Sequence, residues 1–247
     1  MVQVIIKAFD ILELIAQRNG QAVTLTEVAE ELQLNQATSA NIIKTLVARG
    51  YLEHIGKKKG YRLGPAAYRL TNEVPYGKDL VDAAQSVMEA ITAKLNESCL
   101  LGVLRNFKRY TLHIVHSGHE IQVQSPAERN VYETASGRIL LAYLSERELD
   151  RFVQNVGLPD TSLWEEAASF EKLLAELARI KEAGLVMTHL KYRHVRGFAV
   201  PVFAQEQVVA GLSVFLPEYR CTAARQREII AALKEGAEVI RGNLEAR

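Results

Sequence analysis

Polar side chains that can read nucleic-acid bases cluster in the stretch "NQATSANIIKT", from Asn35 to Thr45. If this stretch is a helix, Ile42, Ile43 and Leu46 form its inner face. The residues left pointing outward are Gln36, Ala37, Thr38, Asn41, Lys44 and Thr45. Gln and Asn suit adenine edges, and Thr can contact a base edge or the methyl group of thymine. We therefore predict that these outward residues contact DNA.

A run of lysines follows in "GKKKG", which contains Lys57, Lys58 and Lys59. The segments on either side, "YLEHI" and "YRL", alternate and carry aromatic and β-branched residues, so we expect two strands with the lysines at the hairpin tip. Residues 1–70 hold nine Lys or Arg against six Asp or Glu, whereas the whole chain has a net charge of only +1. A local basic face is the expected footprint of a nucleic-acid binder, with the lysines on phosphates.

Helix signals place these residues in one type of DNA-binding unit. Residues 4–16 are apolar at helical spacing, and Thr24 with Glu27 predicts a capping box at the start of a second helix. Asn35 can cap a third helix, which Gly50 ends. Three helices followed by a hairpin predict a winged helix-turn-helix whose third helix enters the major groove. The alternative is a packing or dimerisation module with the same elements.

The rest of the chain carries other reactive residue types, but no complete catalytic motif. "HIVHSGH" spaces His113, His116 and His119 three apart, yet the flanking "YTLHIV" and "EIQVQ" favour strands, which turn His113 and His116 to opposite faces. Ser136 stands at a helix start, without a His and an acid at a spacing that commits them to it. We therefore expect no enzyme activity, no metal and no cofactor. The alternative is a metal or redox sensor that uses the histidines and one of the two cysteines.

Signals for a membrane or for export are weak in this sequence. It has no run of about 18 apolar residues, the length that a membrane span needs. The apolar first segment carries Lys7, Asp10 and Glu13, which argues against a signal peptide. We therefore expect a cytoplasmic protein with no membrane partner.

Segments spread along nearly the whole chain are similar to those of one family. "KAFDILELIA", "TLTEVAEELQLNQAT", "LVARGYLEH" and "YRLGPAAYRL" come first, and "YETASGRILLAYLSERELDRF" and "RGFAVPVFAQEQVVAGLSV" follow in the second half. Together they resemble the IclR family of bacterial transcriptional regulators. The resemblance implies an α+β fold with an N-terminal winged helix-turn-helix (1–70), a linker and linker helix (71–97), and a C-terminal GAF-like effector-binding domain with an antiparallel sheet (98–247).

Two regions differ from the family pattern. The middle of the recognition helix, where the family often has a basic or His-Arg pair, holds Ala40 and Asn41, and the preceding turn holds Gln33 in place of Gly. The text "VMTHLKYRHVRGFAVPVF" has His and Lys where the family usually has acids, and it lacks the usual Cys. Base readout should therefore be less cationic, and the effectors known for the family are not implied for this chain.

A basic segment lies where the resemblance places the loop and strand edge of the effector pocket. Thr188–Gly197 contains Lys191, Arg193, Arg196 and two histidines, without an acid. A guanidinium can bind both oxygens of a carboxylate, and a serine or a helix-start amide can donate to the same anion. We therefore predict a carboxylate effector bound by Ser136, Gly137, His189, Arg196, Phe198 and Ser213. An exposed basic loop without a ligand is the alternative.

The hypothesis that follows is a sequence-specific DNA-binding transcriptional regulator, expected to be a repressor. A small organic acid from a catabolic pathway would control it by favouring one arrangement of the DNA-binding units. A single winged helix contacts too few bases for useful specificity, so we expect a homodimer or homotetramer on a palindromic double-stranded operator.

Overall fold

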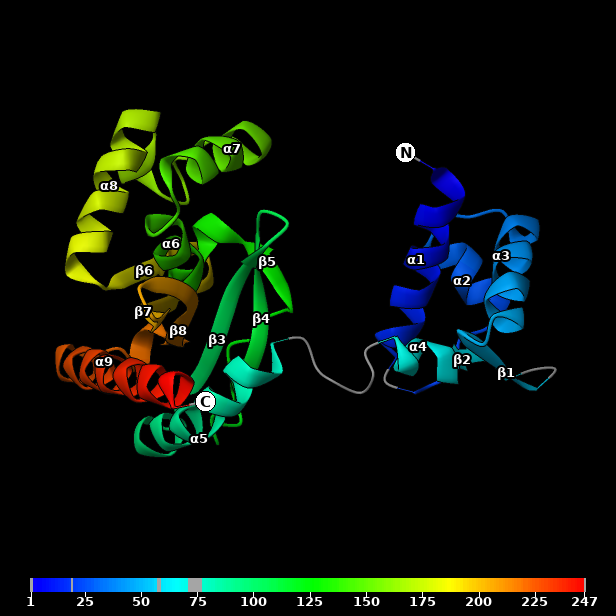
Figure 1. Cartoon of the computed structure of the whole chain (residues 1–247), viewed down its shortest axis with the longest axis horizontal. Coiled ribbons are helices and arrows are strands. Elements are labelled where there is room, and N and C mark those ends of the chain that lie inside the picture. Colours follow the sequence, from blue (N-terminus) through cyan, green and yellow to red (C-terminus); the bar gives the residue numbers. More distant parts are fainter. Residues whose placement is uncertain (1, 19, 57–58, 71–76, 247) are drawn as a thin grey trace. The chain divides into compact units, whose positions relative to one another are not determined.

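The computed structural model describes residues 2–18, 20–56, 59–70 and 77–246 (Figure 1). The chain divides into two units, Met1–Tyr76 and Gly77–Arg247, each with its own hydrophobic core. Within the described ranges, no helix has both the length and the apolar character needed to cross a bilayer.

The first unit contains three helices, a two-stranded hairpin and a short fourth helix. Their bounds are α1 Gln3–Ala16, α2 Leu25–Glu31, α3 Gln36–Ala48, β1 Leu52–Gly56, β2 Gly60–Leu63 and α4 Pro65–Arg69. Both predicted caps are present, because Thr24 forms a capping box with Glu27 and the Asn35 side chain accepts a hydrogen bond from the Ala37 amide. The predicted winged helix-turn-helix is confirmed.

The turn between α2 and α3 is held by backbone geometry and by the core beneath it. Gln33 has a φ of 52°, in the left-handed region that glycine adopts more readily. Ile11 of α1, Val28 of α2 and Ile43 of α3 are buried together in the core. The inner face of α3 is therefore fixed against the other two helices, and its outer face is left for contacts.

The second unit is built on a six-stranded antiparallel sheet with the strand order β5-β4-β3-β8-β7-β6. The strands are β3 Ser98–Arg105, β4 Lys108–Val115, β5 Glu128–Asn130, β6 Val186–Leu190, β7 Val195–Ala204 and β8 Gln207–Pro217. β8 lies between β3 and β7, and its middle residues are buried, as the apolar run "VVAGLSVFL" predicts.

Helices cover both faces of this sheet and enclose two cores (Figure 1). α5 Lys78–Leu95 and α9 Ala223–Glu245 pack on one face, where Met88, Leu95, Leu233 and Ile240 are buried. α6 Ala135–Ala142, α7 Glu146–Val156 and α8 Phe170–Ala183 cover the other face. The structure therefore places α5, the predicted linker helix, in the second unit, and residues 71–76 of the predicted linker lie outside the described residues.

One strand expectation in the second unit is wrong. Glu120–Gln124, whose alternation favoured a strand, belongs to an irregular segment between β4 and β5. The free edge of β4 pairs only with the three residues of β5, so the earlier segment has no strand partner. Instead, Val123, Gln124 and Ser125 of the irregular segment line a pocket.

Candidate functional site

The outer face of α3 presents the residues predicted to read DNA. Gln36, Ala37, Asn41, Lys44 and Thr45 are exposed, and Thr38 is half-buried. The Thr45 hydroxyl donates to the Asn41 carbonyl at 2.9 Å, so its side chain lies along the helix. The geometry suits a helix that meets base edges, and the individual DNA contacts stay predictions.

An apolar groove borders this face of α3. Val4, Ile5 and Phe9 of α1 form one wall, and Asn41 and Thr45 stand at its edge on α3. Val4 is 56%, Ile5 53% and Phe9 57% exposed, although all three are large apolar residues. A contiguous exposed apolar surface of this kind is typical of a binding surface.

The hairpin carries part of the predicted basic wing. Lys59 is exposed beside β2, whereas Lys57 and Lys58 lie outside the described residues. Arg62 of β2 forms an ion pair with Glu53 of β1, which neutralises its charge. The positive charge that the described hairpin offers to a phosphate therefore comes from Lys59.

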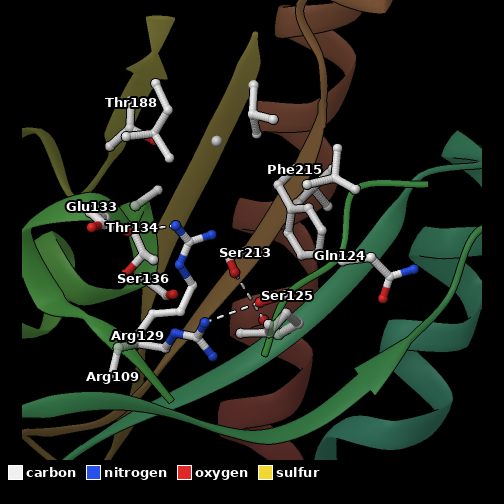
Figure 2. A pocket seen from close by; sticks show the side chains of 17 residues that line it. Arg109, Gln124, Ser125, Arg129, Glu133, Thr134, Ser136, Thr188, Ser213 and Phe215 are labelled. Carbon is white, nitrogen blue, oxygen red and sulfur yellow. Dashed lines mark hydrogen bonds and ion pairs between the residues drawn. The ribbon is translucent and has the colours of Figure 1, made fainter. Parts of the chain in front are cut away.

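A cavity of about 50 Å³ lies in the second unit, beneath the N-terminus of α6 (Figure 2). The strands of the sheet form its floor, and Gln124 and Ser125 of the irregular segment form part of its wall. This volume has room for several water molecules and therefore for a compact ligand. Two of the predicted effector residues, Ser136 and Ser213, line it.

Glycines in the sheet let α6 and neighbouring side chains approach it closely. A Cβ added at Gly102 of β3 would lie 3.0 Å from the Arg109 side chain, and one at Gly211 of β8 would lie 2.9 Å from Ile139 of α6. A Cβ at Gly197 of β7 would lie 2.7 Å from the Thr188 hydroxyl. The small residues therefore make the space in which α6, Arg109 and Thr188 meet.

A buried arginine fixes the position of α6. The Arg138 guanidinium donates to the carbonyls of Tyr132 and Leu163, both at 2.7 Å, and lies 4.1 Å from the ring centroid of Trp164. Burial lowers the pKa of Arg138 to about 10, which leaves the group charged at neutral pH. Arg138 therefore joins α6, the helix that carries Ser136, to Tyr132 before the helix and to Leu163 after it.

Arg109 of β4 is the most buried charged residue in the cavity, with only 1% of its surface exposed. Its Nη1 donates to the Thr111 hydroxyl, and its Nη2 donates to the Ser125 hydroxyl at 3.0 Å. Its Nε has no hydrogen-bond partner within the part of the chain that the structure describes. Burial, and to a lesser extent the charge of Arg129, lowers the pKa of Arg109 to about 10.

Arg129 and Glu133 supply the other charges of the lining. Arg129 Nη2 lies 2.5 Å from Glu133 Oε2, so these two charges neutralise each other. With Arg109, the lining carries a net charge of +1. The cavity is therefore an electropositive site at a helix N-terminus, which favours an anion.

The other predicted effector residues do not meet in this cavity. Thr188 pairs with Gly197 across β6 and β7, and this pair lines the cavity. His189 pairs with Arg196 one position further, so both residues leave the cavity lining. Arg196 forms an ion pair with Glu218, and the His189 ring also contacts that carboxylate. Phe198 is buried in the core against α5 and α9, and the Gly137 amide donates to the Thr134 hydroxyl.

The close approach of His189, whose Nε2 lies 2.8 Å from Glu218 Oε1, is the largest cause that lowers the pKa of Glu218 below its ordinary value. Lys191, Arg193 and His194 of the predicted basic segment are exposed in the turn between β6 and β7. The basic side chains of this segment therefore lie at the surface and not in the cavity.

The cationic residues of the cavity, Arg109 and Arg129, were not predicted from the sequence. Arg109 and Thr111 alternate with Tyr110 and Leu112, a pattern that normally marks a solvated polar face of a strand. Here α6 and the segment around Ser125 cover that face. The alternation of polar and apolar residues is visible in the sequence, but whether the polar face is exposed depends on elements far away in the chain.

The alternative of a metal or redox sensor finds no support in the described residues. No group of three or more His, Cys, Asp or Glu side chains among them is arranged to hold a metal. Burial raises the pKa of the Cys99 thiol to about 12, and burial also raises that of Cys221. Both thiols are free, and burial disfavours the reactive thiolate form of each.

Both parts of the chain match models of one family. Residues 4–56 match the IclR helix-turn-helix domain, and residues 74–241 match the C-terminal domain of the bacterial transcriptional regulator IclR. The chain belongs to the IclR family of bacterial transcriptional regulators. It is therefore a DNA-binding regulator with an effector-binding domain, and not an enzyme.

Named relatives extend over most of the chain. The HTH-type transcriptional regulator KdgR of Escherichia coli (strain K12) is 26% identical over 240 residues, which cover 96% of this chain and 90% of KdgR. The HTH-type transcriptional regulator BhcR of Paracoccus denitrificans is 27% identical over 238 residues, 94% of this chain and 83% of BhcR. The transcriptional repressor IclR of E. coli is 22% identical over 161 residues, 64% of this chain and 58% of that protein.

Solved structures share the architecture. An IclR homologue from Microbacterium hydrocarbonoxydans, complexed with 4-hydroxybenzoate, has a TM-score of 0.77 and 24% identity, and the match covers 99% of this chain and 100% of that one. IclR of Thermotoga maritima has a TM-score of 0.74 and 24% identity, with 99% of both chains covered. These similarities confirm the predicted α+β fold with an N-terminal helix-turn-helix and a C-terminal antiparallel sheet.

Proposed function

We propose that this regulator is a repressor that a small organic acid releases from its operator. The observation that carries the proposal is the electropositive cavity beneath α6, where Arg109 is buried with no carboxylate partner among the described residues. A buried charge without a partner is costly, so a ligand of opposite sign stabilises such a site. The E. coli relative IclR is named a transcriptional repressor, and this supports repression as the output.

Two further features favour a carboxylate over other anions. The amide end of α6 points toward the cavity with Ser136, and hydroxyls of Thr134, Thr188 and Ser213 surround the remaining space. A carboxylate can accept from a guanidinium and from such donors at once. The Microbacterium homologue holds an aromatic acid in its complex, which supports the acid class, while a cavity of about 50 Å³ favours a more compact molecule here.

Control by the acid requires two arrangements of the DNA-binding units. A ligand shifts an equilibrium only if it binds one state more tightly than the other. We infer that the acid stabilises the arrangement with the wrong half-site spacing, so that the cytoplasmic regulator leaves its operator.

A comparison of acids with their amides tests the effector class. An acid that fills the cavity at about 100 times its Kd should stabilise the second unit by about 2.7 kcal/mol, while its neutral amide should have little effect. Melting curves with matched pairs, such as lactate with lactamide and benzoate with benzamide, give the comparison. Equal stabilisation by acid and amide in each pair would contradict a carboxylate effector.

Asn41 and Gln36 are the proposed base-reading residues of α3. Either amide can bind an adenine edge through two hydrogen bonds, so Asn41→Ala should weaken operator binding by about 1–3 kcal/mol and relax the preference at one base position. Binding titrations on the operator and on random DNA measure the effect. An equal loss on both would show that Asn41 contacts only the DNA backbone.

A homodimer or homotetramer is the proposed assembly. Two winged helices on a palindromic operator double the number of bases that are read. The exposed apolar residues of α1 offer a surface for this pairing.

A further inference from the structure

Two arginines face each other on neighbouring strands in the cavity. Arg109 of β4 is the register partner of Arg129 of β5, and both line the cavity (Figure 2). Like charges directly opposite each other across two strands are destabilising. The positive charge of Arg129 is one of the causes that lower the pKa of Arg109. The arrangement therefore carries an electrostatic cost that an anion in the cavity would relieve.

The two guanidiniums differ in what already holds them. Arg129 is 2.5 Å from the Glu133 carboxylate, so its charge is matched within the protein. Arg109 contacts only the hydroxyls of Thr111 and Ser125, and both contacts use its terminal nitrogens. Its buried Nε is left without a partner among the described residues. Arg109 is thus the position in the cavity where a negative charge is missing.

We infer that Arg109 is the specificity-determining residue for the effector, and that the cavity selects a compact acid with one carboxylate over one with two. The inference rests on the proposed function and names the charge of the ligand that the cavity takes. The carboxylate binds the edge of the guanidinium that contains Nε. Thr111 and Ser125 are positioning residues, because they hold the opposite end of the group.

Charge balance sets the number of carboxylates. Arg109 and Arg129 against Glu133 leave a net charge of +1 in the lining, which one carboxylate neutralises. A second carboxylate would lie near Glu133 or would have to displace it from Arg129. A like charge in a small, poorly hydrated cavity is disfavoured. The rest of the ligand therefore carries neutral groups that the surrounding hydroxyls can bind.

Three probes of nearly equal shape separate charge from size. Succinamide is neutral, succinamate carries one negative charge and succinate carries two, so affinities measured by calorimetry at pH 7.5 report charge alone. The full-length protein should bind succinamate about 10–100-fold more tightly than succinamide, the range for a charge-assisted hydrogen bond. Succinate should bind about tenfold or more weakly than succinamate. Tighter binding of succinate would overturn the inference of a single carboxylate.

Two variants test the assignment of the residues. Arg109→Gln should lose the preference for succinamate over succinamide. Glu133→Gln leaves Arg109 in place but frees Arg129, so it should reverse the preference and bind succinate more tightly than succinamate. If the wild-type protein binds the acids and Arg109→Gln binds succinamate equally well, the role of Arg109 is wrong while the proposed function stands. If the wild-type protein binds none of the acids, the proposed effector class fails as well.

A purely structural role of Arg109 predicts a different result in the absence of ligand. If the guanidinium served only to anchor Ser125, Arg109→Gln would lower the melting temperature of the second unit. If it is a charge held for a ligand, removing it should raise that melting temperature by about 2–4 °C. Should Arg109→Gln fail to fold, the anchoring role is the correct one, and the Glu133→Gln titration decides the number of charges.

Discussion

Gly137→Ala should destabilise the second unit by about 2–5 kcal/mol and abolish its response to the effector. A Cβ at this position would lie 2.2 Å from the Val131 carbonyl oxygen and 2.6 Å from the Thr134 hydroxyl. The first contact is with backbone, which cannot rotate away as a flexible side chain can. The first turn of α6 would have to move off residues 131–134, and Ser136 would move with it.

The same displacement would also break a cap, although alanine keeps the backbone N–H. The Gly137 amide donates to the Thr134 hydroxyl at 3.0 Å, the bond that begins α6. Gly242→Ala is a matched control, because that glycine is also helical and a Cβ there has no atom within 4 Å. The control should be neutral or more stable by about 0.5–1 kcal/mol. Thermal unfolding with and without acid measures both variants, and a normal melting curve for Gly137→Ala would refute the packing argument.

Gly137 also shows which features of the site could be predicted from the sequence and which could not. We expected its amide to bind the ligand, because "TASG" places Gly137 at a helix start. The start of the helix was predicted correctly, but the amide is taken by Thr134 and the glycine is required for close packing on residues 131–134. Helix signals are local in the chain, whereas the contacts of a particular amide depend on which segment packs against it.

The strands show a second limit of sequence reasoning. The caps at Thr24 and Asn35 could be predicted because each involves residues no more than three positions apart. The face of a strand that meets the cavity could not be predicted, because moving along the strand by one residue reverses the side to which the side chain points. His189 and Arg196 were therefore assigned to the ligand, although their neighbours Thr188 and Gly197 line the cavity.

Arg109 was missed for a related reason. A basic residue in an alternating strand usually faces solvent, and nothing near it in the sequence announces that α6 will cover it. The cavity takes its positive charge from Arg109 and Arg129 on β4 and β5, and not from the basic segment on β6 and β7. The carboxylate effector stays a prediction, and the structure changes which cationic residues we propose for it.

Replacing Ile5 and Phe9 by Asp should convert the regulator to a monomer and lower its operator affinity by about 10²–10⁴-fold. Both residues are more than half exposed on α1, next to Val4, and together they line the groove beside α3. Burying such apolar surface against a second chain is favourable, and two carboxylates placed in it would have no partner. Loss of pairing removes the second half-site contact, which otherwise forms at high effective concentration.

The measurement is sedimentation at micromolar concentration together with operator titration. Leu174→Asp on α8 is the control, since Leu174 is also a large exposed apolar residue but lies in the second unit. It should leave both the assembly and the operator affinity unchanged. The double variant should keep its helical circular dichroism, because neither residue belongs to the buried core around Ile11 and Ile15. A variant that is still dimeric, or a monomer that binds the operator as tightly as the wild type, would exclude α1 as the pairing surface.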